Sequence, residues 1–541
     1  MRKITIIISC LILFLNIKAQ MTPTEYITKT INVQVAGTLS SLSSYDERYK
    51  INKLIITGNI DARDISCFYS MYNLSILDLS ETSIMEYNGT GGVGPNPYTE
   101  ARLYPANEMP TYSFGFLDYN TTLTSLTLPK TLKSIANSAF YNCRSLSSVT
   151  MYDSLISIGD NAFNSCYSLT YIEIPKNVTN IASNAFIDCI KILEYNVSSE
   201  NYYYTSLDGV IYNKDMSVLF AYPKAKTGSF SIPATVISIG NSAFDHCTNL
   251  LNIQIPNSVS EIGEMAFIGC SSINSIVIPN EVKRINKQTF EFCNYLNSIY
   301  LPDSLTYIGE YAFCGCEDLN SLIIPKKVAY IGNYAFAQCK RLISISLPDS
   351  IKSINEWMFS MCSSLKEIVI PNSVDSIKYA ACQSCTNLEN LIIGKNVKFI
   401  DSRCFAYCNS LKSIYSYPSL PADLSLSLNV FENVNKTTCT LYVPLGTIDT
   451  YKQANQWKDF KAIEEISTGI QTINQSNIKI TTHNERLIIE NANINSKIEI
   501  YDMIGERVNT QFIKSKQFEI LLPKGTYVVR IENYSKKLII K

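Results

Sequence analysis

A spacing of 23 residues governs most of this 541-residue chain and limits its fold more than any other feature. Cysteine recurs at that spacing in one run of three and a second run of eight. Phe stands three residues before each of these cysteines except Cys385, where Cys382 takes the place of Phe. Leu or Ile stands three residues after each of them. These eleven spine cysteines are Cys143, Cys166, Cys189, Cys247, Cys270, Cys293, Cys316, Cys339, Cys362, Cys385 and Cys408.

The repeating unit reads I-G-x-x-A-F-x-x-C-x-x-L-x-x-I-x-I-P-x-x-V-x-x, which has the period and the L-x-x-I-x-I pattern of a leucine-rich repeat. The alternation in L-x-x-I-x-I predicts a short strand, and the following proline ends it. One coil cannot bury its apolar side alone, so successive coils must stack. We therefore expect a leucine-rich-repeat solenoid of short parallel strands joined by turns or 3-10 segments.

Three roles could explain a thiol at a fixed period: a metal ladder, a chain of disulfides or a packing group. A metal ladder lacks closing ligands, because the chain has only two histidines. Stacked strands lie about 4.8 Å apart, too far for the Cβ atoms of a disulfide. The pattern favours buried thiols that act as small apolar groups. Because an exported protein can form disulfides, the interpretation of Cys314–Cys316 and Cys382–Cys385 as local disulfides stays open.

The regions outside the array differ in composition. Residues 1–20 begin with the basic pair Arg2 and Lys3, followed by an apolar run of about 12 residues, which is typical of a signal peptide. Residues 21–116 are an expected N-terminal cap, and residues 117–418 are the solenoid, interrupted at about 195–230 by a β-hairpin that we expect to protrude. Residues 419–466 form the second cap, with a strand and an amphipathic helix. A linker (467–477) and a small β-sandwich (478–541) follow.

The repeat resembles the BspA-type leucine-rich repeats of bacterial surface proteins, and the caps "YPANEMPTYSF" and "TLYVPLGTIDTYKQANQWKDF" extend the resemblance over roughly residues 50–465. The last 64 residues, "IEIYDMIGERV" and "LPKGTYVVRI" among them, resemble a type A sorting domain of the type IX secretion system of Bacteroidetes-type bacteria. Gly505, Arg507, Gly525 and Tyr527 match its pattern. The resemblance implies adhesion to host or bacterial macromolecules and export across the outer membrane.

One outward strand position changes character along the array. From residue 277 onward, six of its seven occupants are apolar or aromatic. We call them the apolar column and expect them to bind a ligand: Val277, Tyr300, Ile323, Val369, Ile392 and Tyr415. Strand propensity alone also favours Val, Ile and Tyr at such positions, and this interpretation stays open.

The remaining signals argue against catalysis. The net charge is −1, which gives no electrostatic basis for nucleic-acid binding. Neither His246 nor His483 stands near a nucleophile motif, so we expect no enzyme activity, metal or cofactor. The prediction is a secreted or cell-surface protein, exported through the periplasm, that binds protein ligands such as extracellular-matrix components. A structural spacer without a ligand and a glycan-capture module are the alternatives.

Overall fold

The computed structural model describes residues 26–114, 122–466 and seven strands with short flanks, at 479–483, 486–490, 497–501, 507–513, 517–522, 525–531 and 534–540. The chain divides into two compact units, residues 1–209 and 210–541, and each is considered by itself. Among the described residues, no helix combines the length and apolarity that crossing a membrane would require.

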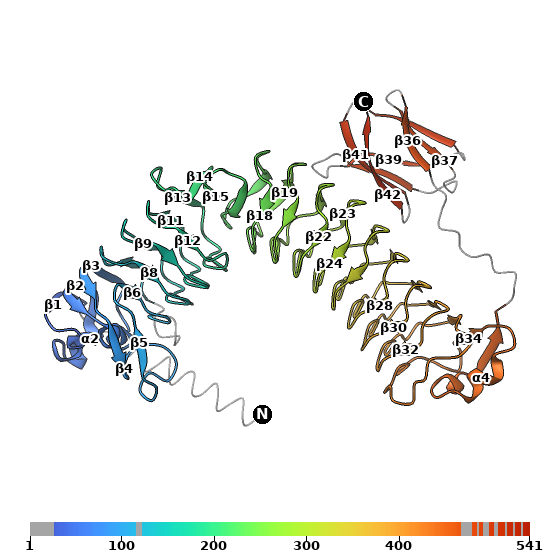
Figure 1. Ribbon diagram of the computed structural model, residues 1–541, viewed down its shortest axis with the longest axis horizontal. Coiled ribbons are helices and arrows are strands. Elements are labelled where there is room, and N and C mark those ends of the chain that lie inside the picture. The colour runs from blue at the N-terminus through green and yellow to red at the C-terminus, as the bar shows by residue number, and fades with distance from the viewer. Residues whose placement is uncertain are drawn as a thin grey trace. The chain divides into compact units, whose positions relative to one another are not determined.

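The first unit opens with a parallel sheet in which the cap strands and the first repeat strands are continuous (Figure 1). Helix α2 (Tyr45–Lys50) is capped by Ser44 and Glu47, and α3 (Ala62–Ser66) by Asp61 and Asp64. The strands of this sheet, in spatial order, are β1 (Ile27–Val33), β2 (Ile51–Ile60), β3 (Ile76–Ile84), β7 (Ser125–Thr127) and β9 (Ser148–Thr150). Strand β11 (Tyr171–Ile174) pairs in parallel with β13 (Glu194–Val197).

The coils also carry a second, two-residue strand that ends at the Ile before the consensus Gly position, which the sequence analysis did not predict. In the first unit these short strands pair in parallel: β6 (Glu108–Met109), β8 (Ser134–Ile135), β10 (Ser157–Ile158) and β12 (Asn180–Ile181). Two sheets therefore flank the core of every coil, which leaves the Ala-Phe segment as the third side.

The second unit repeats this arrangement over more coils (Figure 1). Its long strands are β17 (Gly228–Ser231), β19 (Leu250–Gln254), β21 (Ser275–Val277), β23 (Ser298–Tyr300), β25 (Ser321–Ile323), β27 (Ser344–Ser346), β29 (Glu367–Ile370), β31 (Asn390–Ile393), β33 (Ser413–Ser416), β34 (Thr440–Val443) and β35 (Ala462–Glu465). Its short strands are β18 (Ser238–Ile239), β20 (Glu261–Ile262), β22 (Arg284–Ile285), β24 (Tyr307–Ile308), β26 (Tyr330–Ile331), β28 (Ser353–Ile354), β30 (Ser376–Ile377) and β32 (Phe399–Ile400).

The Ala-Phe segment is a series of turns with two left-handed residues per coil. In one coil these are Tyr311 at φ +55° and Gly315 at φ +73°. Backbone N–H groups of this segment point to the next coil: Phe313 N donates to Ala335 O at 2.8 Å, and Gly315 N donates to Ala337 O at 2.8 Å. The segment thus forms a third inter-coil ladder, so the backbone is hydrogen-bonded on all three sides of the solenoid.

Stacked Phe rings and thiols fill the core between these ladders. From Phe244 to Phe359, successive ring centroids lie 4.9 to 5.7 Å apart. Eight spine thiols donate to the carbonyl oxygen of the Phe in the preceding coil, at 2.9 to 3.3 Å: Cys166, Cys189, Cys270, Cys293, Cys316, Cys339, Cys362 and Cys385. Cys408 donates in the same way to Cys382 O at 3.3 Å. A thiol suits this site because it is small and still donates to an inward-facing carbonyl.

The insert contains the expected hairpin, but the expectation that it protrudes was wrong. Strands β15 (Val210–Asn213) and β16 (Val218–Ala221) are antiparallel, yet Tyr212 and Leu219 are buried in the core. Strand β16 also pairs in parallel with β18. The hairpin is therefore part of the short-strand sheet, because its apolar residues replace those of a missing coil.

The repeat also continues beyond its last spine cysteine. Phe431 stacks on Phe405 with ring centroids 5.8 Å apart, and Val434 is buried three residues after Phe431. Helix α4 (Ile448–Gln453) and the 3-10 turn η3 (Trp457–Asp459) then cover the core with Tyr451 and Trp457, both buried.

The C-terminal strands form two sheets around a small apolar core of their own. Strands β36 (Lys479–His483), β37 (Arg486–Glu490) and β40 (Gln517–Leu521) form one. Strands β39 (Arg507–Phe512), β38 (Lys497–Tyr501), β41 (Gly525–Ile531) and β42 (Tyr534–Ile540) form the other.

Candidate functional site

The apolar column lies on the outward side of the long strands. Strand β29 shows the arrangement, since Ile368 and Ile370 are buried while Val369 between them is 44% exposed. The other five members are partly exposed on β21, β23, β25, β31 and β33. Strand alternation thus turns these side chains away from the core, as the sequence analysis expected.

The strand register brings part of the column into one continuous row. Val369 is paired with Ile392, Ile392 with Tyr415, and Tyr415 with Tyr442 of β34. The Tyr415 and Tyr442 rings stack with centroids 4.7 Å apart and planes 11° apart. We call Val369, Ile392, Tyr415 and Tyr442 the apolar row.

The other column members are less continuous. Val277 is paired with Tyr300 in one two-stranded sheet, and Ile323 is paired with Ser346 in another. The sequence analysis missed Tyr442 because the spacing lapses before it. The segment "TLYVP" has the same strand-then-proline pattern as the repeats and could have revealed it.

A polar row runs beside the apolar row. Glu367, Asn390 and Ser413 stand at the preceding outward position, and Ser413 Oγ lies 2.6 Å from Asn390 Oδ1. Next to them, Lys412 forms an ion pair with Glu389 at 2.6 Å. The Ser413–Asn390 and Lys412–Glu389 contacts run along the solenoid axis and partly satisfy these polar groups, so the apolar row is the better contact surface for a partner.

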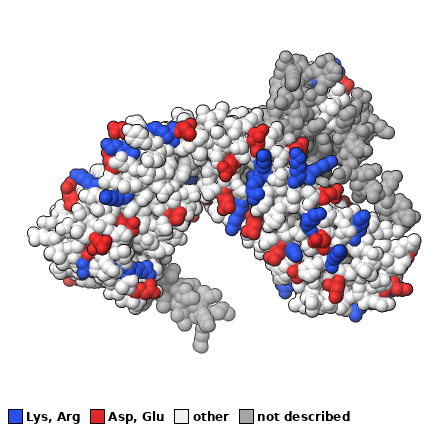
Figure 2. Space-filling view, in the orientation of Figure 1, with Lys and Arg blue, Asp and Glu red and all other residues white. Residues whose placement is uncertain are grey.

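Charged side chains of both signs are interspersed on the face drawn in Figure 2. Several join successive coils, as in the Lys340–Glu317 pair at 2.7 Å. Because such exposed pairs contribute little energy, their main effect is to balance charge coil by coil.

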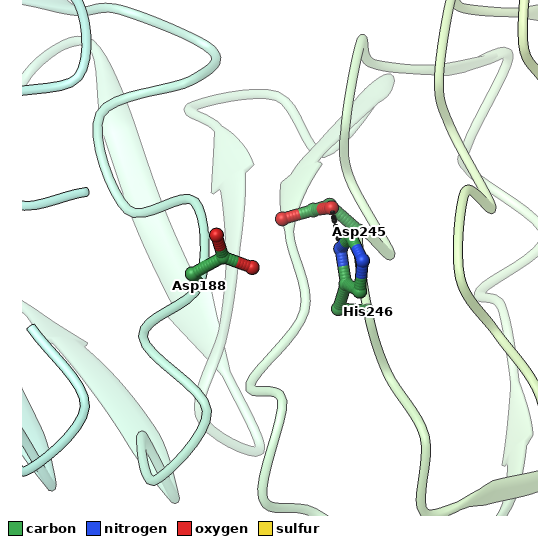
Figure 3. A group of neighbouring side chains, drawn as sticks. All are labelled: Asp188, Asp245 and His246. Carbon is green, nitrogen blue, oxygen red and sulfur yellow. Dashed lines mark hydrogen bonds and ion pairs between the residues drawn. The ribbon is translucent and has the colours of Figure 1, made fainter. Parts of the chain in front are cut away.

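The two histidines, His246 and His483, are the residues that the sequence analysis considered and rejected as catalytic candidates. His246 Nδ1 contacts the carboxylate of Asp245 (Figure 3), and Lys224 forms an ion pair with the same carboxylate. Asp245 and Lys224 are buried, whereas His246 is half-exposed. Burial alone raises the pKa of Asp245, but Lys224 and His246 outweigh it and hold the pKa below its usual value. The cluster fixes the end of the insert to the coil that carries Asp245. His483 is the last residue of β36.

The thiols are unsuited to chemistry. All described cysteines from Cys67 to Cys439 are free, including both members of the Cys314–Cys316 and Cys382–Cys385 pairs. Burial raises the pKa of Cys143 and of Cys293 to about 12. A nucleophile or metal ligand needs the thiolate, which burial disfavours here.

The proposed sorting residues lie on the C-terminal strands or outside the described part of the chain. Gly505 falls outside the described residues. Arg507 is the first residue of β39 and Gly525 the first of β41. Tyr527 is 7% exposed and packs in the core of this region.

Two sequence families match the chain. The BspA type leucine rich repeat region matches residues 108–215, 216–343, 286–412, 332–458 and 384–503, which together span well over half of the sequence. A domain of unknown function, DUF6383, matches residues 467–540. No curated protein matches the chain.

Solved structures with similar folds are leucine-rich-repeat proteins. One from Eubacterium ventriosum is 23% identical, with a TM-score of 0.44 over 65% of this chain and 89% of that one. A leucine-rich cell surface protein from Faecalibacterium prausnitzii is 23% identical, with a TM-score of 0.39 over 66% and 86%. A third, from Bacteroides ovatus, is 24% identical, with a TM-score of 0.40 over 68% and 88%.

Proposed function

Because the chain belongs to the BspA-type leucine-rich-repeat family, we propose that it is a non-catalytic binding protein that uses the long-strand face of its solenoid to hold a macromolecule. The observation that carries the proposal is the apolar row, in which Val369, Ile392, Tyr415 and Tyr442 stand side by side. A protein ligand on a cell surface or in the extracellular matrix fits this row best, since aliphatic and tyrosine side chains together favour apolar protein contacts.

The rigidity of the array supports the same proposal. The strand ladders fix the row before any ligand arrives, so little conformational entropy is lost on binding. Each coil adds one contact at a spacing of about 4.8 Å, and a partner that spans four coils gains all of them together. Such a surface suits an adhesin, in which many modest contacts sum to useful affinity.

The experiment is a binding screen of the purified chain against matrix proteins, mucins and glycans, with Val369→Ser/Tyr415→Ser alongside. Tyr171→Ser is the matched control, because Tyr171 is an exposed strand tyrosine outside the apolar row. We expect saturable binding to a protein that the double change weakens about 10-fold or more and the control leaves intact.

Other outcomes decide between the alternatives. Saturable binding with the same affinity in the double variant is consistent with an adhesin but refutes the apolar row as its binding site. Binding to glycans alone favours a glycan-capture module. No binding across the panel favours a structural spacer.

For export we propose that residues 478–541 act as a type IX sorting domain and residues 1–20 as a signal peptide, which places the mature protein outside the cell or on its surface. The two-sheet architecture of the C-terminal strands supports a small separate domain. Deleting residues 478–541 in a type IX-secreting host is expected to leave the protein in the periplasm. Normal appearance of the truncated protein outside the cell refutes the assignment.

A further inference from the structure

The turn side of the solenoid carries a second ordered set of aromatic side chains. Tyr311 stacks on Tyr334 with ring centroids 4.6 Å apart, and Tyr334 stacks on Trp357 with centroids 5.7 Å apart. The ring planes differ by 7° and 8°. We call these three residues the aromatic ladder. They belong to the Ala-Phe turns rather than to either sheet, and they are half-buried.

The backbone at these positions disfavours large side chains. Tyr311, Tyr334 and Trp357 have φ values of +55°, +57° and +57°, in the left-handed region that a bulky residue rarely adopts. The equivalent position in other coils of the second unit holds residues without an aromatic ring: Ser242, Met265, Gln288, Ala380 and Arg403. Stacking offsets part of the strain, but it does not explain why three consecutive coils carry aromatics here. The coils from Ser242 to Arg403 all share this left-handed backbone, so the strain belongs to the repeat, and the run of three aromatics is the feature to be explained.

Two carboxylates flank the ladder without a cation. Glu310 and Glu356 precede Tyr311 and Trp357 and stand at the same repeat position, two coils apart. Neither forms an ion pair with any residue that the structure describes. Glu310 is half-exposed and Glu356 exposed. Asn333 holds the position between them, and Lys287 holds it one coil before Glu310. The three coils of the ladder itself therefore carry two negative charges and no positive charge at this position.

The carboxylates lie close to the aromatic rings. Burial and Tyr334 raise the pKa of Tyr311, and the charge of Glu310 adds to the rise. Burial and the charge of Glu356 raise the pKa of Tyr334. Because stacked rings cover one another's faces, the ladder presents its edges to solvent, next to the carboxylates. A ligand here meets aromatic edges and negative charge together.

The spacing selects one kind of ligand. Two coils span about 9.5 Å, and one turn of a polyproline II helix spans about 9 Å over three residues. A basic residue at every third position of such a helix therefore reaches successive carboxylates, while the prolines between pack on the aromatic side chains. We propose that the turn side at Tyr311, Tyr334 and Trp357 is a docking site for a proline-rich basic polypeptide segment, distinct from the apolar row.

The test uses the full chain with Trp457→Phe, which leaves Trp357 as the one tryptophan. The probe is a peptide of three Pro-Pro-Arg repeats, and a peptide of the same composition with its arginines adjacent is the comparison. We expect saturable change in Trp357 fluorescence with the first peptide and weaker binding of the second. Glu310→Gln/Glu356→Gln is expected to weaken binding about 10-fold, since two charge pairs are lost.

Glu264→Gln is the matched control, because Glu264 stands at the same repeat position beside Met265 rather than an aromatic. It is expected to leave the affinity unchanged, as is Val369→Ser/Tyr415→Ser on the other face, so this proposal and the adhesin proposal can fail separately. The inference is overturned if the fluorescence change does not saturate by 1 mM peptide, which corresponds to a binding free energy weaker than about −4 kcal/mol. It is also overturned if the peptide binds the Glu310→Gln/Glu356→Gln variant as tightly as it binds the chain with the unsubstituted glutamates. Binding of chitohexaose or cellohexaose without the peptide overturns it in favour of a glycan site.

Discussion

Raising the pH should unfold this protein through its spine thiols, and Cys293 allows the effect to be isolated. Cys293 is buried, and its sulfur donates to Phe267 O at 3.1 Å. Burial raises its pKa from 9.0 to about 12. The folded state therefore holds the proton where the unfolded state releases it. The stability that this thiol contributes is complete below pH 9 and is lost as the pH rises from 9 toward 12.

The magnitude follows from the size of the shift. At pH 10, one unit above the unfolded pKa, a thiol that stays protonated in the folded state costs about 1.4 kcal/mol of stability. Seven other spine cysteines have pKa values raised by burial: Cys143, Cys166, Cys270, Cys316, Cys339, Cys362 and Cys408. The loss over the whole array is several times that of one site, so alkaline unfolding should be steep.

The measurement compares Cys293→Ala with the native chain by urea unfolding, in reductant, at pH 7 and pH 10. At pH 7 the variant should be less stable by about 1–2 kcal/mol, because a small buried group is lost. At pH 10 that penalty should shrink by about 1.4 kcal/mol, since only the native chain loses the thiol's contribution.

Val282→Ala is the control, because Val282 is fully buried in the same array and does not titrate. Its penalty should be the same at both pH values. A Cys293→Ala penalty that also stays constant between pH 7 and pH 10 would refute the reasoning, because it would mean that the thiol titrates alike in both states.

Three further predictions address the core, the insert and the turns. Phe313→Ala should lower the free energy of unfolding by about 3–5 kcal/mol, since the ring is fully buried between two others, and a loss below 1 kcal/mol in thermal unfolding would contradict this. Asp245→Asn should cost about 3–5 kcal/mol at pH 7, because it leaves Lys224 buried without its partner. The lowered pKa of Asp245 means that the native chain loses this stability as the pH falls below about 4, so the two proteins should converge in acid. Gly332→Ala should destabilise the chain by about 1–3 kcal/mol, because the new Cβ would lie 2.5 Å from the backbone N of Glu310, and an unchanged melting temperature would contradict it.

The sequence predicted the long strands and the core because both follow one period. Any residue that faces the core must recur every 23 positions, so Phe, Cys and Leu mark the inward side of each coil without reference to the rest of the chain. The short strands were not predicted because a two-residue strand is too short to show an alternating apolar pattern. Ser353–Ile354 pairs with Ser376–Ile377 of the next coil only because the coils are already stacked.

The turn conformation could not be predicted for a related reason. Left-handed residues are normally signalled by Gly or Asn, and Gly315 fits that rule, but Tyr311 and Trp357 occupy the same kind of backbone. Here the inter-coil hydrogen bonds impose the conformation and override the preference of the side chain. The hairpin was wrongly expected to protrude for the same reason. The sequence shows alternating apolar residues around Tyr212 and Leu219, but it does not show that a missing coil leaves room to bury them.

The repeat separates the residues that build the array from those that can vary. Core positions such as Phe313 and Cys316 are fixed by packing within the stack, whereas Tyr311 and Ile323 in the neighbouring turn and strand are not. Each variable position recurs in register along the axis, so a ligand that spans several coils meets the same position several times. Changing one residue then removes one contact among several, which makes the double variants the decisive tests. If single changes in the apolar row abolished binding, a localised site rather than a shared surface would be the better account.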